Sequence, residues 1–211
     1  MRIQYLESID STQSYLKKLL QEKKVQTPYA VVSKIQTNGQ GSRDNSWIGL
    51  EGNLFLSFAL SLEELPKDMK LESASIYFSY ILKETLKEFG SSVWLKWPND
   101  FYINNFKIGG MITNLVGKDL ICGVGINLIK NPEGFEKLDI NISIEKLLNL
   151  YFINIAKRSS WKQIFSKYKL EFHKSQNFST HKNGLQFSLG NAILNNDGSV
   201  VINGERIYST R

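Results

Sequence analysis

Short apolar segments of strand-like composition make up most of this chain, and helical patterning interrupts them in only a few places. The strand pattern occurs at residues 2–6, 29–36, 53–61, 93–97, 100–104, 106–116 and 120–129. Residues 71–89 (LESASIYFSYILKETLKEF) have apolar residues at helical spacing and are followed by Gly90, which predicts a helix. Another helix should begin after Asp10 or Ser11, which can cap it, and residues 143–173 should be largely helical. This order indicates an α+β fold, a mixed central β-sheet flanked by helices.

The chain is predicted to divide into two parts of unequal size. Its 211 residues suit one domain with a small appendage. We expect residues 1–180 to form the main domain and residues 181–211 to form a small C-terminal β module with turns at its glycines. A segment this short cannot bury a core alone, so the module should pack on the main domain.

The amino-acid composition restricts the compartment and the cofactor class. Cys122 is the single cysteine, so no intrachain disulfide can form, which fits a reducing, cytoplasmic location. One cysteine and two histidines are too few for an ordinary His/Cys metal site, so we expect no built-in metal. No apolar run is long enough to span a membrane, and the first ten residues lack the apolar region of a secretory signal.

The net charge of +6 lies entirely in residues 157–211, which hold nine basic and three acidic residues. A solvated basic helix and tail would explain this charge. A nucleic-acid patch, or attraction to an acidic protein or to ATP, would explain it too. Residues 1–156 balance 17 basic against 17 acidic residues, which argues against a chain devoted to nucleic-acid binding.

Motifs for several common chemistries are missing. The sequence has no GxxxxGK[ST] phosphate loop, no complete GxGxxG, no HExxH and no GxSxG. Cys122 lies among apolar residues, as an inert core thiol does, and His173 and His181 are expected at the surface. A site that works through positioning and positive charge is therefore favoured over a built-in nucleophile.

Two segments have the composition of such a site. In KWPNDFYINNFKIGG (96–110), Lys96 and Lys107 flank a predicted hairpin, and the paired glycines allow close approach of a ligand or another strand. An ordinary hairpin with charged ends would have similar residues. The segment 37–52 (TNGQGSRDNSWIGLEG) has four glycines and no periodicity, so we predict a long loop that folds over a ligand.

Together these segments resemble the biotin–protein ligase family. The hairpin carries K-W-P-N-D followed by K-x-x-G, and the loop is similar to the family's Q-x-x-G-R-G-R-x-x-R-x-W pattern. The segments D-S-T-Q (10–13), G-N-L-F-L-S (52–57) and G-V-G-I-N (123–127) also resemble family motifs, and the match covers about residues 5–130. Since few residues precede Ser11, we expect the short form, without a DNA-binding domain and without sequence-specific DNA binding.

The resemblance implies a class II synthetase/biotin ligase-like fold, with residues 1–180 as the catalytic domain. Family members activate biotin with ATP and Mg²⁺ as biotinoyl-5′-AMP. They then transfer biotin to one lysine of a biotin carboxyl carrier protein, a subunit of acetyl-CoA carboxylase or a similar enzyme. Such chemistry needs positioning and cations more than a nucleophile. The protein could be a monomer or a homodimer.

The resemblance also implies roles for individual residues. The catalytic residues would be Lys107, Arg43 and Asp100, with Mg²⁺ arriving on ATP near Asp100. Biotin would be bound by Ser11, Thr12, Gln13, Gln36, Gly39, Gln40, Gly41, Ser42, Lys107, Gly110 and Gly125. ATP would be bound by Arg43, Trp47, Lys96, Asn99, Asp100, Asn127 and Arg211.

The loop departs from the family pattern, which leaves alternatives open. Gln40, Ser42 and Asn45 stand where the family often has arginine, and amides and hydroxyls replace arginine forks poorly at phosphates. We expect Arg43 to take over this contact; the alternative is that pyrophosphate binding uses Lys96, Lys107 and Mg²⁺ more heavily. A lipoate or octanoate ligase-like enzyme, or a biotin binder with weakened catalysis, remains an alternative.

Overall fold

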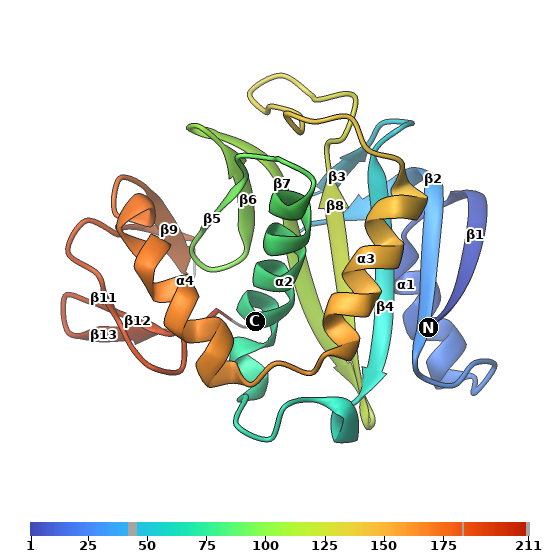
Figure 1. Cartoon of the computed structure of the whole chain (residues 1–211), viewed down its shortest axis with the longest axis horizontal. Coiled ribbons are helices and arrows are strands. Elements are labelled where there is room, and N and C mark those ends of the chain that lie inside the picture. The colour runs from blue at the N-terminus through green and yellow to red at the C-terminus, as the bar shows by residue number, and fades with distance from the viewer. Residues whose placement is uncertain (42–45, 183, 210–211) are drawn as a thin grey trace.

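An eight-stranded mixed sheet is the centre of the computed structural model, which describes residues 1–41, 46–182 and 184–209 (Figure 1). The strand order is β1–β2–β4–β8–β7–β6–β5, and β3 pairs with β2. β1 and β2 run parallel, and the other neighbouring pairs are antiparallel. The strands are β1 Arg2–Ile9, β2 Tyr29–Gln40, β3 Ser46–Gly49, β4 Leu54–Ser61, β5 Trp94–Lys96, β6 Asp100–Ile103, β7 Phe106–Val116 and β8 Asp119–Ile126. The predicted α+β fold with a mixed central sheet is confirmed.

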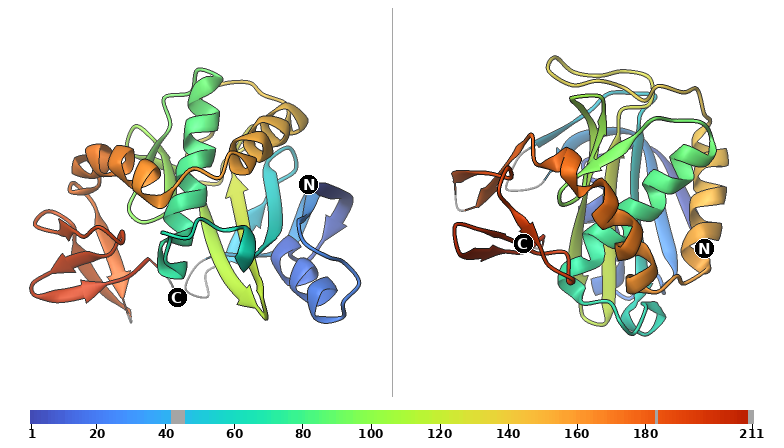
Figure 2. Two further views of the ribbon diagram at one scale, coloured as in Figure 1. Left: turned by 60° about the horizontal axis from the view of Figure 1, so that its bottom comes forward. Right: turned by 60° about the vertical axis from the view of Figure 1, so that its left-hand side comes forward.

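Helices cover both faces of this sheet (Figure 2). α1 (Thr12–Gln21) lies on one face, and α2 (Ala74–Glu88), α3 (Ile144–Ala156) and α4 (Trp161–Ser175) lie on the other. Short 3₁₀ turns, η1 (Leu62–Glu64) and η2 (Leu71–Ser73), precede α2. Ser11 caps α1, since its side chain accepts a hydrogen bond from the Ser14 N–H, as the sequence predicted.

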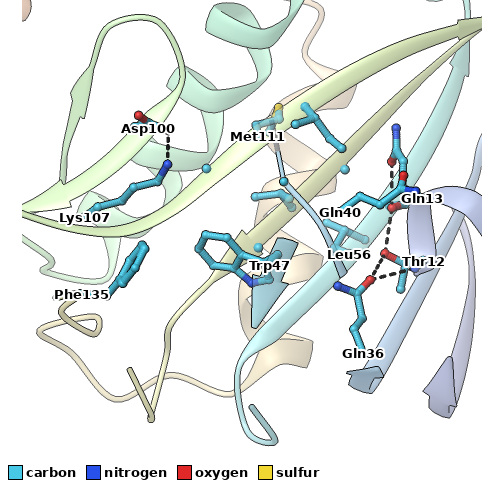
Figure 3. A pocket seen from close by; sticks show the side chains of 17 residues that line it. Thr12, Gln13, Gln36, Gln40, Trp47, Leu56, Asp100, Lys107, Met111 and Phe135 are labelled. Carbon is cyan, nitrogen blue, oxygen red and sulfur yellow. Dashed lines mark hydrogen bonds and ion pairs between the residues drawn. The ribbon is translucent and has the colours of Figure 1, made fainter. Parts of the chain in front are cut away.

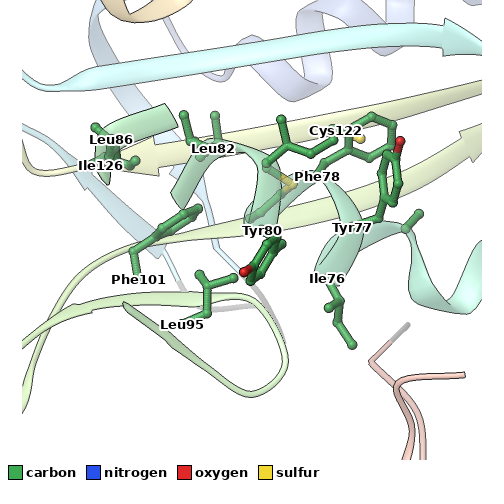
Figure 4. Close-up of a cluster of buried hydrophobic side chains, with 14 of the residues drawn as sticks. Ile76, Tyr77, Phe78, Tyr80, Leu82, Leu86, Leu95, Phe101, Cys122 and Ile126 are labelled. Atoms are coloured by element: carbon green, nitrogen blue, oxygen red, sulfur yellow. The ribbon is translucent and has the colours of Figure 1, made fainter. Parts of the chain in front are cut away.

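Alternation along the strands builds two cores. On β4, Leu56 and Phe58 point into the large cluster beneath α2 and α3, while Ala59 packs with Leu16 of α1 on the opposite face. Figure 4 shows the part of the large cluster around α2, where Cys122 also lies. Burial raises the pKa of the Cys122 thiol well above its usual value, as expected for an inert core cysteine.

A buried ion pair ties α4 to α2. Lys83 of α2 is fully buried, and its Nζ lies 2.6 Å from Glu171 Oε1 of α4 and 2.7 Å from Glu84 Oε1. A buried charge is tolerated only when it is paired in this way. The pairing fixes the position of α4 beside the β5–β6 end of the sheet.

One expectation about local structure was wrong in part. The segment 37–52 is not a plain loop, because β2 continues to Gln40 and pairs with β3. This hairpin is held by backbone pairing and has no apolar pattern in its sequence. Gly49 allows the two strands to approach, since a Cβ there would lie 2.2 Å from Gln36 O. The region 143–173 is largely helical, as predicted, with a break between Ala156 and Trp161, where Ser160 starts α4 with a capping box.

The chain after α4 forms two small sheets. β9 (Ser179–Lys182) pairs with β10 (Leu185–Ser188), and β11 (Ile193–Leu194), β12 (Val200–Ile202) and β13 (Glu205–Ile207) form a three-stranded antiparallel sheet. A small C-terminal β structure is thereby confirmed, whereas a domain boundary at residue 180 stays a prediction. Within the described residues, no helix has the length and apolar character needed to cross a membrane.

Candidate functional site

A cavity of about 280 Å³ lies beside α1 and extends to the β6–β7 hairpin (Figure 3). Ten of the residues predicted for the site line it: Thr12, Gln13, Gln36, Gln40, Gly41, Trp47, Asp100, Lys107, Gly110 and Gly125. The remaining lining residues were not predicted: Leu56, Ser57, Met111, Ile112, Gly123, Val124 and Phe135. The fold therefore brings all five motif segments of the sequence together around one space.

One end of the cavity is a chain of polar side chains. Gln36 Oε1 accepts hydrogen bonds from the Thr12 N–H (2.8 Å) and from Thr12 Oγ1 (3.0 Å). Thr12 Oγ1 lies 2.9 Å from Ser57 Oγ, which donates to Gln13 Oε1 (3.0 Å). The Gln13 amide in turn donates to Asn114 Oδ1 (3.0 Å). This chain holds amides and hydroxyls in fixed orientations for a small polar group.

The two glycines of β8 leave room for the site. A Cβ on Gly123 would lie 2.4 Å from Gln13 Oε1, so the polar end depends on a glycine there. A Cβ on Gly125 would lie 2.7 Å from Trp47 Nε1 and 2.8 Å from Trp47 Cε2. Such separations are too short for real Cβ atoms, so these two residues form the floor of the cavity because they lack side chains.

Aromatic rings form the middle of the cavity. The rings of Trp47 and Phe135 meet edge to face, with their centroids 6.1 Å apart. Trp47 Nε1 is buried and has no hydrogen-bond partner among the described residues. A buried donor without a partner is costly, and a bound molecule with an acceptor would satisfy it.

The other end of the cavity is charged. Lys107 Nζ lies 2.7 Å from Asp100 Oδ1, and Lys96 Nζ lies 3.7 Å from Asp100 Oδ2. Gly110 adjoins the pair, since a Cβ there would be 3.1 Å from Asp100 Oδ1 and 3.6 Å from Lys107 Nζ. The side chains are only partly exposed (27% for Lys107 and 21% for Asp100), so their charges act with less screening than at the surface. Two ammonium groups around one carboxylate leave a net positive end that suits an anion.

The segment after β8 is tied down by two side chains, the buried Asn53 and the exposed Asp139. Asn53 Oδ1 accepts hydrogen bonds from the N–H groups of residues 128, 129 and 130. Asp139 accepts hydrogen bonds from Ser91 and Ser92; burial opposes its ionisation, but these bonds outweigh burial and lower its pKa. These two anchors hold Phe135 in place over the cavity.

Asn53→Ala should lower the free energy of unfolding by about 2–4 kcal/mol, since it leaves three backbone N–H groups with no acceptor. Urea denaturation would measure the change. Asn131→Ala is the matched control, because Asn131 makes one exposed hydrogen bond, to Phe135 O, in the same segment. Equal losses in both variants would contradict the anchoring role of Asn53.

Several predicted site residues lie next to the cavity but do not line it. Ser11 caps α1, and Gly39 allows β3 to approach Gln36. Asn99 donates to Met111 O and accepts from the Met111 N–H, which braces the hairpin. Asn127 is fully buried and donates to Glu136 O. Lys96 contacts Asp100 and is not among the lining residues of the cavity. Ser42, Arg43 and Arg211 lie outside the described residues.

The unpredicted lining residues had little signal in the sequence. Ser57 ends the G-N-L-F-L-S segment and could have been assigned from it. Phe135 lies in a segment without periodicity, and only its contact with Trp47 places it at the site. Among the described residues, no group of three or more His, Cys, Asp or Glu side chains could hold a metal ion.

Comparisons with known proteins agree with this site. Residues 5–131 match the model of the biotin/lipoate A/B protein ligase family. The bifunctional ligase/repressor BirA of Escherichia coli is 33% identical over 127 residues, which is 57% of this chain and 38% of that protein. The chain thus spans well under half the length of this curated relative.

Solved structures extend the similarity to nearly the whole chain. The biotin acetyl coenzyme A carboxylase synthetase of Helicobacter pylori, crystallised with biotinylated ATP, superposes with a TM-score of 0.94 and 37% identity. That match covers 98% of this chain and 99% of the other. The biotin protein ligase of Aquifex aeolicus, in complex with biotin and ATP, has a TM-score of 0.77 at 23% identity, covers 98% and 94% of the two chains, and supports the fold alone. Because the family model matches residues 5–131 and the similarity to the H. pylori protein extends over nearly the whole chain, the chain belongs to the biotin/lipoate A/B protein ligase family.

Proposed function

We propose that this protein is an ATP-dependent biotin–protein ligase. It would activate biotin as biotinoyl-5′-AMP and transfer biotin to a lysine of a biotin carboxyl carrier protein. The observation that carries the proposal is one cavity with an amide-and-hydroxyl end at Thr12 and Gln36 and a cationic end at Lys107. The H. pylori relative, of matching length and crystallised with biotinylated ATP, supports it.

The polar end suits the ureido ring of biotin. A ureido group has two N–H donors and one carbonyl acceptor, and the chain from Gln36 to Gln13 offers both kinds of partner. The apolar valeryl chain of biotin would run past Trp47 and Met111 toward Lys107. The length and polarity of the cavity therefore match a molecule with a polar head, an apolar middle and an anionic end.

Lys107 would stabilise negative charge in the first step. An oxygen of the biotin carboxylate attacks the α-phosphorus of ATP, the bond to pyrophosphate breaks, and biotinoyl-5′-AMP forms. Charge builds on the phosphoryl oxygens during this substitution, and a fixed ammonium group nearby lowers its barrier. Asp100 holds Lys107 Nζ at 2.7 Å and so keeps the charge in position.

The second step consumes the adenylate. The neutral amine of the carrier lysine attacks the acyl carbon, AMP leaves with the bonding electrons, and the amine nitrogen loses its proton. Asp100 is the carboxylate among the described cavity-lining residues, so we assign proton acceptance to it. Mg²⁺ would enter as the ATP complex, and the Asp100 carboxylate is the cavity-lining group that could bind it.

Gln40 lines the cavity where related proteins often have arginine. An amide can donate to phosphate but adds no charge, so Lys107, Lys96 and Arg43 would hold the phosphates. The carrier protein is proposed as the partner, and a cytoplasmic location as the compartment on the strength of the single buried cysteine.

Thr12→Val should weaken biotin binding about 10- to 100-fold, because the variant keeps the side-chain shape and removes the hydroxyl between Gln36 and Ser57. Isothermal calorimetry with biotin would measure the dissociation constant. Thr37→Val is the control, since Thr37 lies on β2 next to Gln36 and its hydroxyl donates to Asp10 at the surface. An unchanged dissociation constant in Thr12→Val would show that biotin does not bind at this end of the cavity.

The proposed function is tested by pyrophosphate release from ATP with either biotin or lipoate. Release with biotin alone, followed by labelling of a carrier domain, is the expected result. Release with lipoate instead would assign the other branch of the family. If biotin binds but no pyrophosphate appears, the protein is a binder and not a ligase.

A further inference from the structure

A turn of the C-terminal three-stranded sheet (β11–β13) is held by three donors from the main domain. Trp161 Nε1 donates to Asn196 O (2.8 Å), Ser73 Oγ to Asp197 O (2.7 Å) and Trp97 Nε1 to Gly198 O (2.8 Å). Three successive carbonyls of one turn are thus bound from α4, from η2 and from the turn after β5. A turn that only connected β11 to β12 would have no need of such partners.

The position of Gly198 in this turn favours glycine. Gly198 has φ +78°, a conformation that other residues adopt at a cost. A Cβ on it would lie 2.7 Å from Ile76 Cδ1 and 3.2 Å from Trp161 Cη2. The turn therefore packs directly against α2 and α4, on the side of the molecule away from α1 (Figure 2).

Trp97 connects this seat with the cavity. Its indole N–H binds Gly198 O, its backbone N–H donates to Ser175 Oγ (2.9 Å), and its side chain is 1% exposed. Two residues further on, Asn99 O accepts from the Met111 N–H (3.2 Å). The next residue is Asp100, which holds Lys107. The C-terminal sheet is thus connected to the charged end of the cavity through the Trp97–Gly198 hydrogen bond, the chain segment 97–100 and the Asp100–Lys107 ion pair.

The polar end of the cavity has no part in these contacts. Thr12, Gln36 and Ser57 belong to α1, β2 and β4, and their hydrogen bonds run among themselves and to β7 through Gln13 and Asn114. A disturbance at Gly198 would therefore reach the charged end and leave the polar end unchanged.

We propose that the Asn196–Gly198 turn positions the charged end of the site, with Trp97 and Gly198 as positioning residues that act through the 97–100 segment. The proposal rests on the proposed function and deepens it. Docking of the turn sets where Asp100 and Lys107 stand relative to the carboxylate and the α-phosphate. A shift of about 1 Å at such a centre can cost about 100-fold in rate.

Gly198→Ala tests the proposal, with Gly204→Ala as its matched control. Gly204 lies in the same small sheet at φ +81°, but a Cβ there would meet nothing within 4 Å. Both variants carry the same backbone strain, and only the first disturbs docking. We expect Gly198→Ala to lower kcat for biotin-dependent pyrophosphate release about 10- to 100-fold with an unchanged biotin Kd, whereas Gly204→Ala stays close to wild type.

Amide hydrogen exchange, which does not depend on enzymatic activity, tests this proposal separately from the proposed function. In Gly198→Ala, the Met111 amide, which donates to Asn99 O, should exchange its hydrogen about tenfold faster or more than in Gly204→Ala. Ser73→Ala, which removes one of the three donors, is a milder variant that should shift kcat and exchange in the same direction. If Gly198→Ala and Ser73→Ala match Gly204→Ala in both exchange and kcat, the positioning role is overturned. A wild-type protein that releases no pyrophosphate, but still shows the exchange difference, overturns the proposed function and keeps the structural coupling.

Discussion

Lys107→Ala should lower biotin-dependent pyrophosphate release by about 100- to 1,000-fold or more, the largest loss expected from any single substitution here. Lys107 Nζ is fixed 2.7 Å from Asp100 Oδ1 at the charged end of the cavity, where the phosphoryl oxygens would gain charge. Steady-state release of pyrophosphate, with single-turnover formation of the adenylate, would measure the effect. The loss should appear in kcat, since the polar end, where we propose that biotin binds, remains intact.

Lys118→Ala provides the control for the loss of one positive charge. Lys118 is exposed at the turn between β7 and β8, just after the end of the strand that carries Lys107, and it lies outside the cavity. Its replacement should leave kcat unchanged. Activity near wild type in Lys107→Ala would refute both the catalytic role of Lys107 and the mechanism built on it.

Gly125→Ala should weaken binding of a hydrolysis-resistant biotinoyl-adenylate analogue about 5- to 100-fold. The added methyl group would meet Trp47 at 2.7 Å and 2.8 Å, so the indole must leave its place over β8. Overpacking of this kind typically costs about 1–3 kcal/mol, and displacement of Trp47 narrows the cavity in its middle. Calorimetric titration would measure the dissociation constant.

A double-mutant cycle with Trp47→Ala identifies the cause. Once the indole is absent, the extra methyl group has nothing to displace, so the double variant should bind no more weakly than Trp47→Ala alone. Additive losses would mean that Gly125→Ala acts on the ligand directly. Wild-type affinity in Gly125→Ala would show that Trp47 can move at no cost.

The arginine-poor loop is the main difference between this chain and the pattern it resembles. The described part of the loop places Gln40 and Gly41 at the cavity and orders β3 so that Trp47 reaches Gly125. Among the described residues, the cations near the site are Lys96 and Lys107, which flank the β6–β7 hairpin and both pair with Asp100. We expect ATP affinity in this protein to depend on these two lysines more than in relatives with a full arginine loop.

Local patterning was enough to predict most of the secondary structure and the motif residues. The apolar run in residues 53–61 predicted β4, whose successive residues face α2 and α1 in turn because strand side chains point to opposite faces. The spacing in 71–89 and Gly90 located α2 to within three residues at its start. The K-W-P-N-D and K-x-x-G motifs identified Lys107, Asp100 and Gly110, which the fold places together.

Contacts between distant segments could not be predicted from the sequence. β3 forms through backbone pairing with β2 and has no apolar pattern of its own, so the sequence showed only a loop. Phe135 reaches the site because Asn53, far away in the chain, accepts hydrogen bonds from the backbone that leads to it. The sequence alone determined the fold class and the chemical groups of the site. The tertiary structure decided which groups share one cavity, and it assigned Trp97 to the C-terminal turn, because such pairings depend on packing across the sheet and not on local spacing.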